Sequence, residues 1–383
     1  MITLEQVHEL ARLRGEEFPV STLFLSLDGG RDKRKADILI KDLIKKQRAE
    51  LDQRPLSRAQ RDSVEQDFAA MLRFVHHFDR HGARSIAVFS SAGAGLWRFH
   101  ALAQPVRDRL VVDTHAHVRP LTRLLGQFRR AVVILLARDH ASLATIAVGE
   151  MRGLVRLTGD VPHEVKAGGF AGSAERRLER HAEDRLHRFV KLVAERTTDA
   201  LRSDPDALLV AGGPPDVLAE LDTCIPGALQ ERIIARIPLG PESPPAEVLA
   251  RVSAEVRRHE QENGIRIART AIRDREATGL AAVGLKPVLG AFGRGQVATL
   301  AIAPGLVRPG LACGACHGLA LDGSACPACG GGLLPVPDIV EELVGRALAR
   351  SVTVIEVEGE PELDAVGGIA ALLRYRTNGK TAA

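Results

Sequence analysis

Aromatic side chains are scarce in this sequence of 383 residues: Phe, Trp and Tyr make up 3% of it, with one Trp and one Tyr. Proteins that read single-stranded nucleic acid by stacking offer aromatic rings to the bases. The composition therefore argues against base stacking as the main mode of recognition. If the chain binds RNA, we expect contacts mainly with the phosphates.

The sequence also lacks the features of a membrane or secreted protein. No apolar run reaches the roughly 20 residues that a membrane-spanning helix needs. Residues 1–18 read as an amphipathic helix that contains acidic side chains, which is unlike a signal peptide. We therefore expect a cytoplasmic protein with no membrane partner.

Common catalytic motifs are missing as well. The sequence contains no G-x-S-x-G elbow, no P-loop and no H-E-x-x-H pair. Among 13 histidines, the pairs His76-His77 and His115-Ala-His117 stand out, and we expect each pair on the surface or in the core rather than on a metal. The sequence assigns no catalytic residue.

A basic segment near the N-terminus is the clearest concentration of charge. Between Arg31 and Arg48, eight Lys or Arg residues stand against three Asp, a local charge of +5 in a chain with a net charge of +4. One interpretation is a solvated helix face. The other is phosphate contact, because bound Lys and Arg release counterions from nucleic acid. The predicted RNA-binding residues are Lys33, Arg34, Lys35, Lys41, Lys45 and Lys46.

Apolar patterning predicts a multidomain α/β (α+β) protein with three domains, at residues 1–125, 126–245 and 246–383. A Pro/Gly-rich stretch, residues 238–245, marks the second boundary. The predicted strands are 22–27, 85–91, 130–137, 143–149, 207–213, 296–302 and 352–357. The predicted helices are 31–53, 57–80, 173–200 and 338–350, with others beginning near Pro214 and filling most of 246–292.

Four of the five cysteines form two CxxC pairs separated by nine residues, within an insertion at 311–332. Each CxxC turn aims two sulfurs at one point, and two such knuckles complete a tetrahedral thiolate shell that suits one structural zinc ion. An iron–sulfur cluster or an empty knuckle are the alternatives. The predicted ligands are Cys313, Cys316, Cys326 and Cys329, with His317 as a neighbour and Cys224 as a core residue.

Residues 161–173 contain several small side chains and are predicted to form an exposed loop, with Ser173 as the N-cap of the following helix. In that helix, apolar residues share one face and arginines gather on the opposite face. One interpretation of the charged face is a solvated surface with i,i+4 ion pairs, and the other is contact with RNA.

Three separated stretches resemble the archaeo-eukaryotic class-I release factor and Pelota superfamily, in the bacterial branches that include Balon-like hibernation factors. Residues 163–196 are similar to the family's tip loop and the helix behind it. Residues 207–213 are similar to the strand that follows, and residues 366–376 to the closing strand of the L7Ae-like domain. The zinc knuckles agree, since archaeal members carry a comparable ribbon.

This resemblance implies a protein that enters the ribosomal A site, with a release-factor-like central domain at the peptidyl-transferase centre and an L7Ae-like third domain that contacts a translational GTPase. The residues it places against rRNA near that centre are Lys166, Gly168, Gly169, Phe170, Ser173, Arg176, Arg177 and Arg180. In a release factor, glutamine after the two glycines helps to place the water that hydrolyses peptidyl-tRNA. Phe170 stands at that position and has no hydrogen-bonding group.

Three functions follow as hypotheses. The first is a non-catalytic ribosome-binding factor for hibernation or rescue, acting as a monomer. The second is a peptide release factor that works without the usual glutamine, although the sequence contains no Asn-Ile-Lys-Ser stop-codon motif. The third is an RNA-binding stress protein that acts away from the ribosome. We favour the first, because Phe170 removes the side chain on which release chemistry depends.

Overall fold

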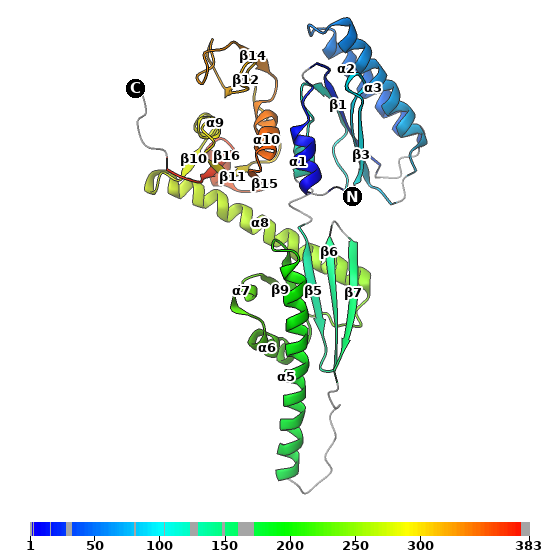
Figure 1. Ribbon diagram of the computed structural model, residues 1–383, viewed down its shortest axis with the longest axis vertical. Coiled ribbons are helices and arrows are strands. Elements are labelled where there is room, and N and C mark those ends of the chain that lie inside the picture. Colours follow the sequence, from blue (N-terminus) through cyan, green and yellow to red (C-terminus); the bar gives the residue numbers. More distant parts are fainter. Residues whose placement is uncertain are drawn as a thin grey trace. The chain divides into compact units, whose positions relative to one another are not determined.

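The computed structural model describes residues 2, 4–15, 17–27, 33–79, 82–102, 104–122, 129–147, 150–159 and 172–376 (Figure 1). Contacts divide the chain into two compact units: residues 1–126 together with 261–383, and residues 127–260. Each unit combines β-sheets with helices, so the expected α/β (α+β) multidomain class is confirmed. None of the helices in these ranges is long and apolar enough to cross a membrane.

The N-terminal part of the first unit is an antiparallel sheet in the order β3-β2-β1-β4. Its elements are α1 (Leu4–Arg12), β1 (Val20–Ser26), α2 (Lys33–Leu51), α3 (Arg58–His77), β2 (Ser85–Ser91), η1 (Ala92–Ala94), β3 (Leu96–Leu102) and β4 (Arg109–Asp113). Leu23 and Leu25 on β1 pack with Ile40 and Phe68 of the two long helices. Phe24, pointing to the other face, meets Phe89 edge to face.

The C-terminal part of the first unit holds a second sheet, in the order β10-β16-β11-β15, and a three-stranded ribbon, β13-β12-β14. Its elements are β10 (Ala281–Val283), α9 (Leu285–Gly293), β11 (Val297–Ile302), β12 (Gly310–Cys313), β13 (Leu319–Ala320), β14 (Leu333–Val336), α10 (Ile339–Ala349), β15 (Thr353–Glu356), α11 (Pro361–Ala365) and β16 (Ile369–Leu373). Asp338 caps α10 by accepting from the Val340 amide at 3.1 Å. Nearly every residue of α10 is buried, charged ones included.

The second unit is a five-stranded mixed sheet in the order β7-β6-β5-β8-β9. Its elements are β5 (Ala131–Leu136), β6 (His140–Ala147), β7 (Glu150–Thr158), α5 (Gly172–Arg202), β8 (Leu208–Gly212), α6 (Pro215–Cys224), α7 (Gly227–Gln230) and β9 (Ile233–Ile237). Strands β5 and β6 form a hairpin, closed by a hydrogen bond of 2.8 Å from the Ala137 amide to the His140 carbonyl. Strands β5, β8 and β9 run parallel.

Helix α8 (Pro245–Ala277) contributes to both units. Alternate residues of β5 face opposite sides of the sheet, where Ile134 meets α5 and α6, and Val133 meets the first half of α8. Val248, Val252 and Val256 make that contact, and residues up to 260 belong to the second unit. The division into three domains stays a prediction.

Candidate functional site

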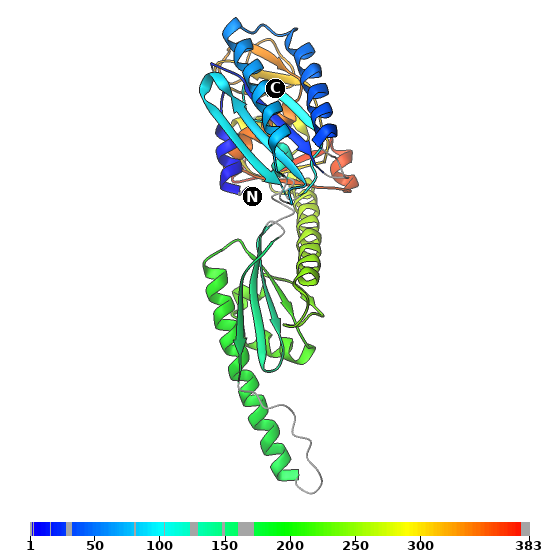
Figure 2. The same cartoon turned by 90° about the vertical axis from the view of Figure 1, so that its right-hand side faces the viewer.

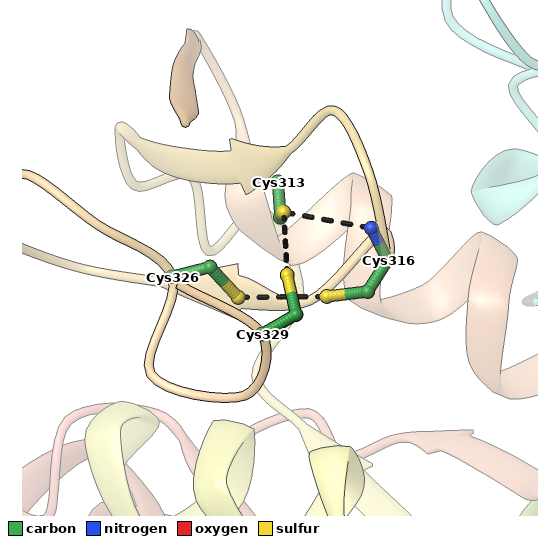
Figure 3. A group of neighbouring side chains, drawn as sticks. All are labelled: Cys313, Cys316, Cys326 and Cys329. Atoms are coloured by element: carbon green, nitrogen blue, oxygen red, sulfur yellow. Dashed lines mark hydrogen bonds between the residues drawn. The ribbon is translucent and has the colours of Figure 1, made fainter. Parts of the chain in front are cut away.

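The four cysteines of the two CxxC pairs converge at one end of the β12–β14 ribbon (Figure 3). Cys313 Sγ lies 3.5 Å from Cys329 Sγ, and Cys316 Sγ lies 3.5 Å from Cys326 Sγ. All four sulfur atoms lie within 4.8 Å of one another. Zinc–sulfur bonds of about 2.3 Å would place tetrahedral ligands about 3.8 Å apart. The donor set and its spacing therefore fit a tetrahedral metal ion.

The local sequence explains how both turns form. The residue after the second cysteine of each pair has positive φ, at 59° for His317 and 72° for Gly330. Gly331 is needed for another reason: a Cβ there would lie 3.3 Å from the sulfurs of Cys313 and Cys329. Glycine therefore eases the second turn, whereas in the first turn His317 adopts the left-handed conformation without it.

Backbone groups tune the thiols. The N–H groups of Cys316 and Ala315 point at Cys313 Sγ and lower the pKa of that thiol to about 6. Hydrogen bonding with Cys329 raises the pKa of Cys316 to about 12. The cluster thus favours a thiolate near neutral pH, and the thiolate is the form that binds metals.

A second group of titratable side chains lies buried in the first unit, where residues 113–119 meet α10. His115 Nδ1 is 3.1 Å from Glu342 Oε1, and His117 Nδ1 is 3.4 Å from Glu341 Oε1. His117 Nε2 is 3.3 Å from Asp113 Oδ2. The sequence singled out the two histidines as surface or core residues, and the structure places both in the interior.

The surroundings give the two imidazoles opposite charge preferences. Burial opposes a charge on His117, but its interactions with Asp113 and Glu341 outweigh burial and raise its pKa to about 9. Burial lowers the pKa of His115. Burial also works against the charged form of Asp113, yet the hydrogen bond with His117 holds its pKa below the usual range.

Neither of two further clusters has the geometry of a metal site. The rings of His115 and His117 are stacked, with planes at 19° and centroids 5.0 Å apart, so their in-plane lone pairs do not converge on one ion. On α5 and α6, His187 Nδ1 and Glu220 Oε1 lie 2.5 Å apart, with Cys224 Sγ 3.9 Å from the same nitrogen. Two such ligands on one zinc would lie about 3.3 Å apart. That pair is a hydrogen bond, and Cys224 is half-buried beside the core rather than within it.

The basic helix α2 presents part of its predicted charge to solvent. Lys35, Lys41, Lys45 and Lys46 are exposed, because Ile40 and Ile44 turn the other side of the helix into the core. The side chains of Lys33 and Arg34 lie outside the described residues. Arg48 is paired with Glu65 at 2.5 Å. The role of the exposed lysines in RNA binding stays a prediction.

The predicted tip contacts are only partly described. Lys166, Gly168, Gly169 and Phe170 lie outside the described residues, as do the side chains of Ser173, Arg176 and Arg177, whose backbone belongs to α5. Arg180 is exposed. Their contacts with rRNA stay predictions.

Helix α5 has 31 residues, about 46 Å at 1.5 Å per residue. The core contacts begin at Leu186 and Phe189, so more than a third of the helix extends beyond the sheet, as Figures 1 and 2 show.

Comparison with known sequences shows which proteins this chain is similar to. A family model described as bacterial archaeo-eukaryotic release factor family 10 matches residues 117–257. Peptide chain release factor subunit 1 of Methanocaldococcus jannaschii is 28% identical over 303 residues, 69% of this chain and 70% of that protein. The sequence is therefore similar to archaeo-eukaryotic release factors, most clearly over residues 117–257. The corresponding subunit of Methanopyrus kandleri is 28% identical over 142 residues, 36% of this chain and 34% of that protein.

Solved structures of Pelota and related factors superpose on this chain with low TM-scores. Pelota of Archaeoglobus fulgidus is 13% identical, covers 98% of this chain and 94% of its own, and gives a TM-score of 0.37. Dom34 of S. cerevisiae, a translation termination-like factor, is 12% identical, covers 77% and 80%, and gives a TM-score of 0.41.

Sequence reasoning missed the acidic partners of the buried histidines. Glu341 and Glu342 stand side by side in α10, where adjacent acids normally indicate a solvated helix face. Their sequence context could have indicated burial. Val340 and Leu343 flank the two acids, so the helix has no continuous polar face on which they could be solvated.

Proposed function

We propose that this protein binds the ribosome in the A site as a non-catalytic hibernation or rescue factor. The observation that carries the proposal is Phe170, which follows Gly168 and Gly169 at the tip position of a chain whose matched relatives are peptide chain release factors. A phenyl ring can neither donate nor accept the hydrogen bonds that orient an attacking water. The loop therefore acts as a contact or a plug at the peptidyl-transferase centre.

The described part of the central unit supports this use of the loop. Helix α5 begins at Gly172, directly after the loop segment, and its first residues stand clear of the sheet. Among the described side chains of this helix, those from Leu186 onward pack on the core, and a helix held there can carry a loop to a site far from its own core. Arginines at its start, of which Arg180 is exposed, would meet the phosphates of rRNA there.

The lysines of α2 provide a second RNA-facing surface. Lys41, Lys45 and Lys46 are exposed on the side of the helix away from the core. With so few aromatic side chains in the chain, phosphate contact is the mode of RNA binding that these residues suit. Their target would be rRNA or the decoding region.

The four cysteines would hold one structural zinc ion. Four thiol donors leave no open coordination position, so the ion would stabilise the ribbon and take no part in chemistry. The third region, with its ribbon, would contact a translational GTPase. We further propose that the protein acts as a monomer in the cytoplasm.

Binding tests the placement on the ribosome. The purified chain is sedimented with vacant ribosomes and with ribosomes whose A site is filled by aminoacyl-tRNA. We expect co-sedimentation with the vacant ribosomes and loss of binding when the A site is filled. Equal binding to both would exclude the A site. Absence of binding to either would favour an RNA-binding protein that acts away from the ribosome.

A further inference from the structure

A chain of polar contacts connects the buried histidines of residues 113–119 with the cysteine knuckles through α10. Glu342 uses Oε1 to face His115 at 3.1 Å and Oε2 to accept from Arg346 Nη2 at 2.6 Å. Arg346 also donates through Nη1 to the carbonyl of His317, the residue directly after Cys316. Three consecutive contacts thus connect His115 with His317, the residue next to the predicted ligand Cys316.

Arg346 is suited to this position by its chemistry. Its planar guanidinium donates in two directions at fixed angles, so one side chain holds a carboxylate and a carbonyl together. Its side chain is 14% exposed and that of Glu342 is 7% exposed, which limits competition from water. A lysine carries the same charge but has no fork with which to span both acceptors.

The direction of the His317 carbonyl, which accepts from Arg346, depends on the conformation of the Cys313–Cys316 turn. His317 has a φ of 59°, and its N–H donates to the Cys313 carbonyl at 3.1 Å. A metal that fixes both sulfurs of this pair fixes the turn and thereby the direction of the His317 carbonyl. Loss of the metal removes that constraint, since the turn then rests on backbone hydrogen bonds alone.

The segment on the other side is held partly through α10 and partly through the loop that precedes β12. Beyond the histidine contacts, the Arg119 amide donates to Glu341 Oε1 at 3.4 Å, and the Arg119 guanidinium donates to the Leu306 carbonyl at 2.7 Å. Because Glu341 and Glu342 are consecutive residues of one buried helix, a shift of that helix moves both carboxylates and so affects both contacts.

We propose that metal loading of the four cysteines and docking of residues 113–119 onto α10 are coupled through Arg346 and Glu342. The metal-loaded knuckle holds Arg346, Arg346 holds Glu342, and Glu342 holds His115. The coupling is reciprocal, so weakening the docked segment also weakens metal binding by the same factor. The inference rests on the proposed zinc site.

Hydrogen exchange of the full chain tests the coupling. Exchange of the peptide containing residues 113–119 is measured with zinc bound and after chelation, in the native chain, in Arg346→Lys and in Arg350→Lys. Arg350 is the matched control, since it lies just after α10 and its contacts are with Phe292. Its guanidinium donates to the Phe292 carbonyl at 3.3 Å and lies over the Phe292 ring. Residues 127–260 form a separate unit and serve as an internal reference for intact folding.

In the native chain and in Arg350→Lys, chelation should speed exchange of this peptide about fivefold or more, the low end of coupling between sites. In Arg346→Lys the exchange should be fast already and should not respond to chelation, and zinc affinity should fall by a similar factor. An equal response in all three chains would overturn the coupling. Zinc content, measured in the same samples, separates the two proposals: a native chain that holds no zinc fails the metal site itself and the coupling with it.

Discussion

The imidazoles of His115 and His117 stack face to face in the interior of the first unit, with centroids 5.0 Å apart and planes inclined by 19°. Two charged rings in this arrangement would repel each other in a medium where burial already penalises charge. The structure resolves the conflict by giving the rings different partners. Asp113 and Glu341 flank His117 and favour its charged form, whereas burial keeps His115 neutral.

The pH dependence of stability should therefore have two limbs. The pKa of His117 is raised to about 9, so its stabilisation is fully present below pH 6.5 and is lost as the pH rises through 9. At about 1.4 kcal/mol per pKa unit, the shift from 6.5 to about 9 limits this loss to about 3.5 kcal/mol. Urea unfolding of the native chain and of His117→Asn between pH 6 and pH 9.5 measures it. The fall in unfolding free energy should be much smaller in the variant, and parallel curves would contradict the assignment.

His115 should produce the opposite slope at lower pH. Its pKa is lowered by burial, so the unfolded chain takes up a proton that the folded chain refuses. Stability from this residue is present above pH 6.5 and declines as the pH falls below it. Urea unfolding of His115→Gln between pH 5 and pH 7 should show a shallower decline than the native chain. A steeper decline would show that His115 is charged in the folded state.

Replacing one knuckle cysteine should remove the metal. Cys326→Ser takes one thiolate from a shell that needs four, so zinc content should fall from one ion per chain towards none, with a lower melting temperature. Cys224→Ser is the control, because Cys224 belongs to the other unit and is not one of the four clustered cysteines. Metal analysis of both purified variants decides between the outcomes. Loss of zinc in Cys224→Ser as well would contradict the assignment of the four clustered cysteines as the complete ligand set.

Two glycines of the ribbon provide a test of its packing. A Cβ at Gly331 would lie 3.3 Å from two cysteine sulfurs, whereas one at Gly314 would meet only Leu334 at 3.8 Å. Gly331→Ala should therefore weaken zinc binding, by about tenfold if the crowding costs about 1.4 kcal/mol, and Gly314→Ala should leave it nearly unchanged. Competition with a chromophoric chelator measures both affinities. Equal affinities would mean that the turns adjust without cost.

The lysines of α2 should set the salt dependence of ribosome binding. Changing Lys41, Lys45 and Lys46 to Gln removes up to three phosphate contacts, each worth about 0.7–0.9 in the slope of log affinity against log salt. The control removes three exposed charges elsewhere, at Arg251, Arg257 and Arg258. Sedimentation at several salt concentrations gives the slopes. The same change in both triple variants would indicate a general charge effect rather than a defined surface.

Much of the framework could be predicted because strong patterns specify it. Strand β2 begins and ends at the predicted residues 85 and 91, and the two CxxC pairs gave the four clustered thiols. Strand β7 was missed because it is an exposed edge strand interrupted by Gly153 at a φ of 64°, which breaks the alternation that marks a strand.

Other features depend on partners that are distant in the sequence. The packing of Val248 and Val252 at the start of α8 against the sheet of the second unit is one example, because the Pro/Gly-rich stretch before α8 carries no sign of it. The pairing of His115 with Glu342 joins residues more than 200 positions apart. No local pattern specifies such a contact, so sequence reasoning could assign the histidines only to the surface or the core.

The most direct test of the central claim is peptide release. Ribosomes carrying peptidyl-tRNA are incubated with the native chain and with Phe170→Gln, and both released peptide and bound protein are measured. The account predicts that the native chain binds and releases no peptide above background, and that the glutamine variant, with a side chain able to orient water, gains release. Release by the native chain at a rate above background would contradict the account.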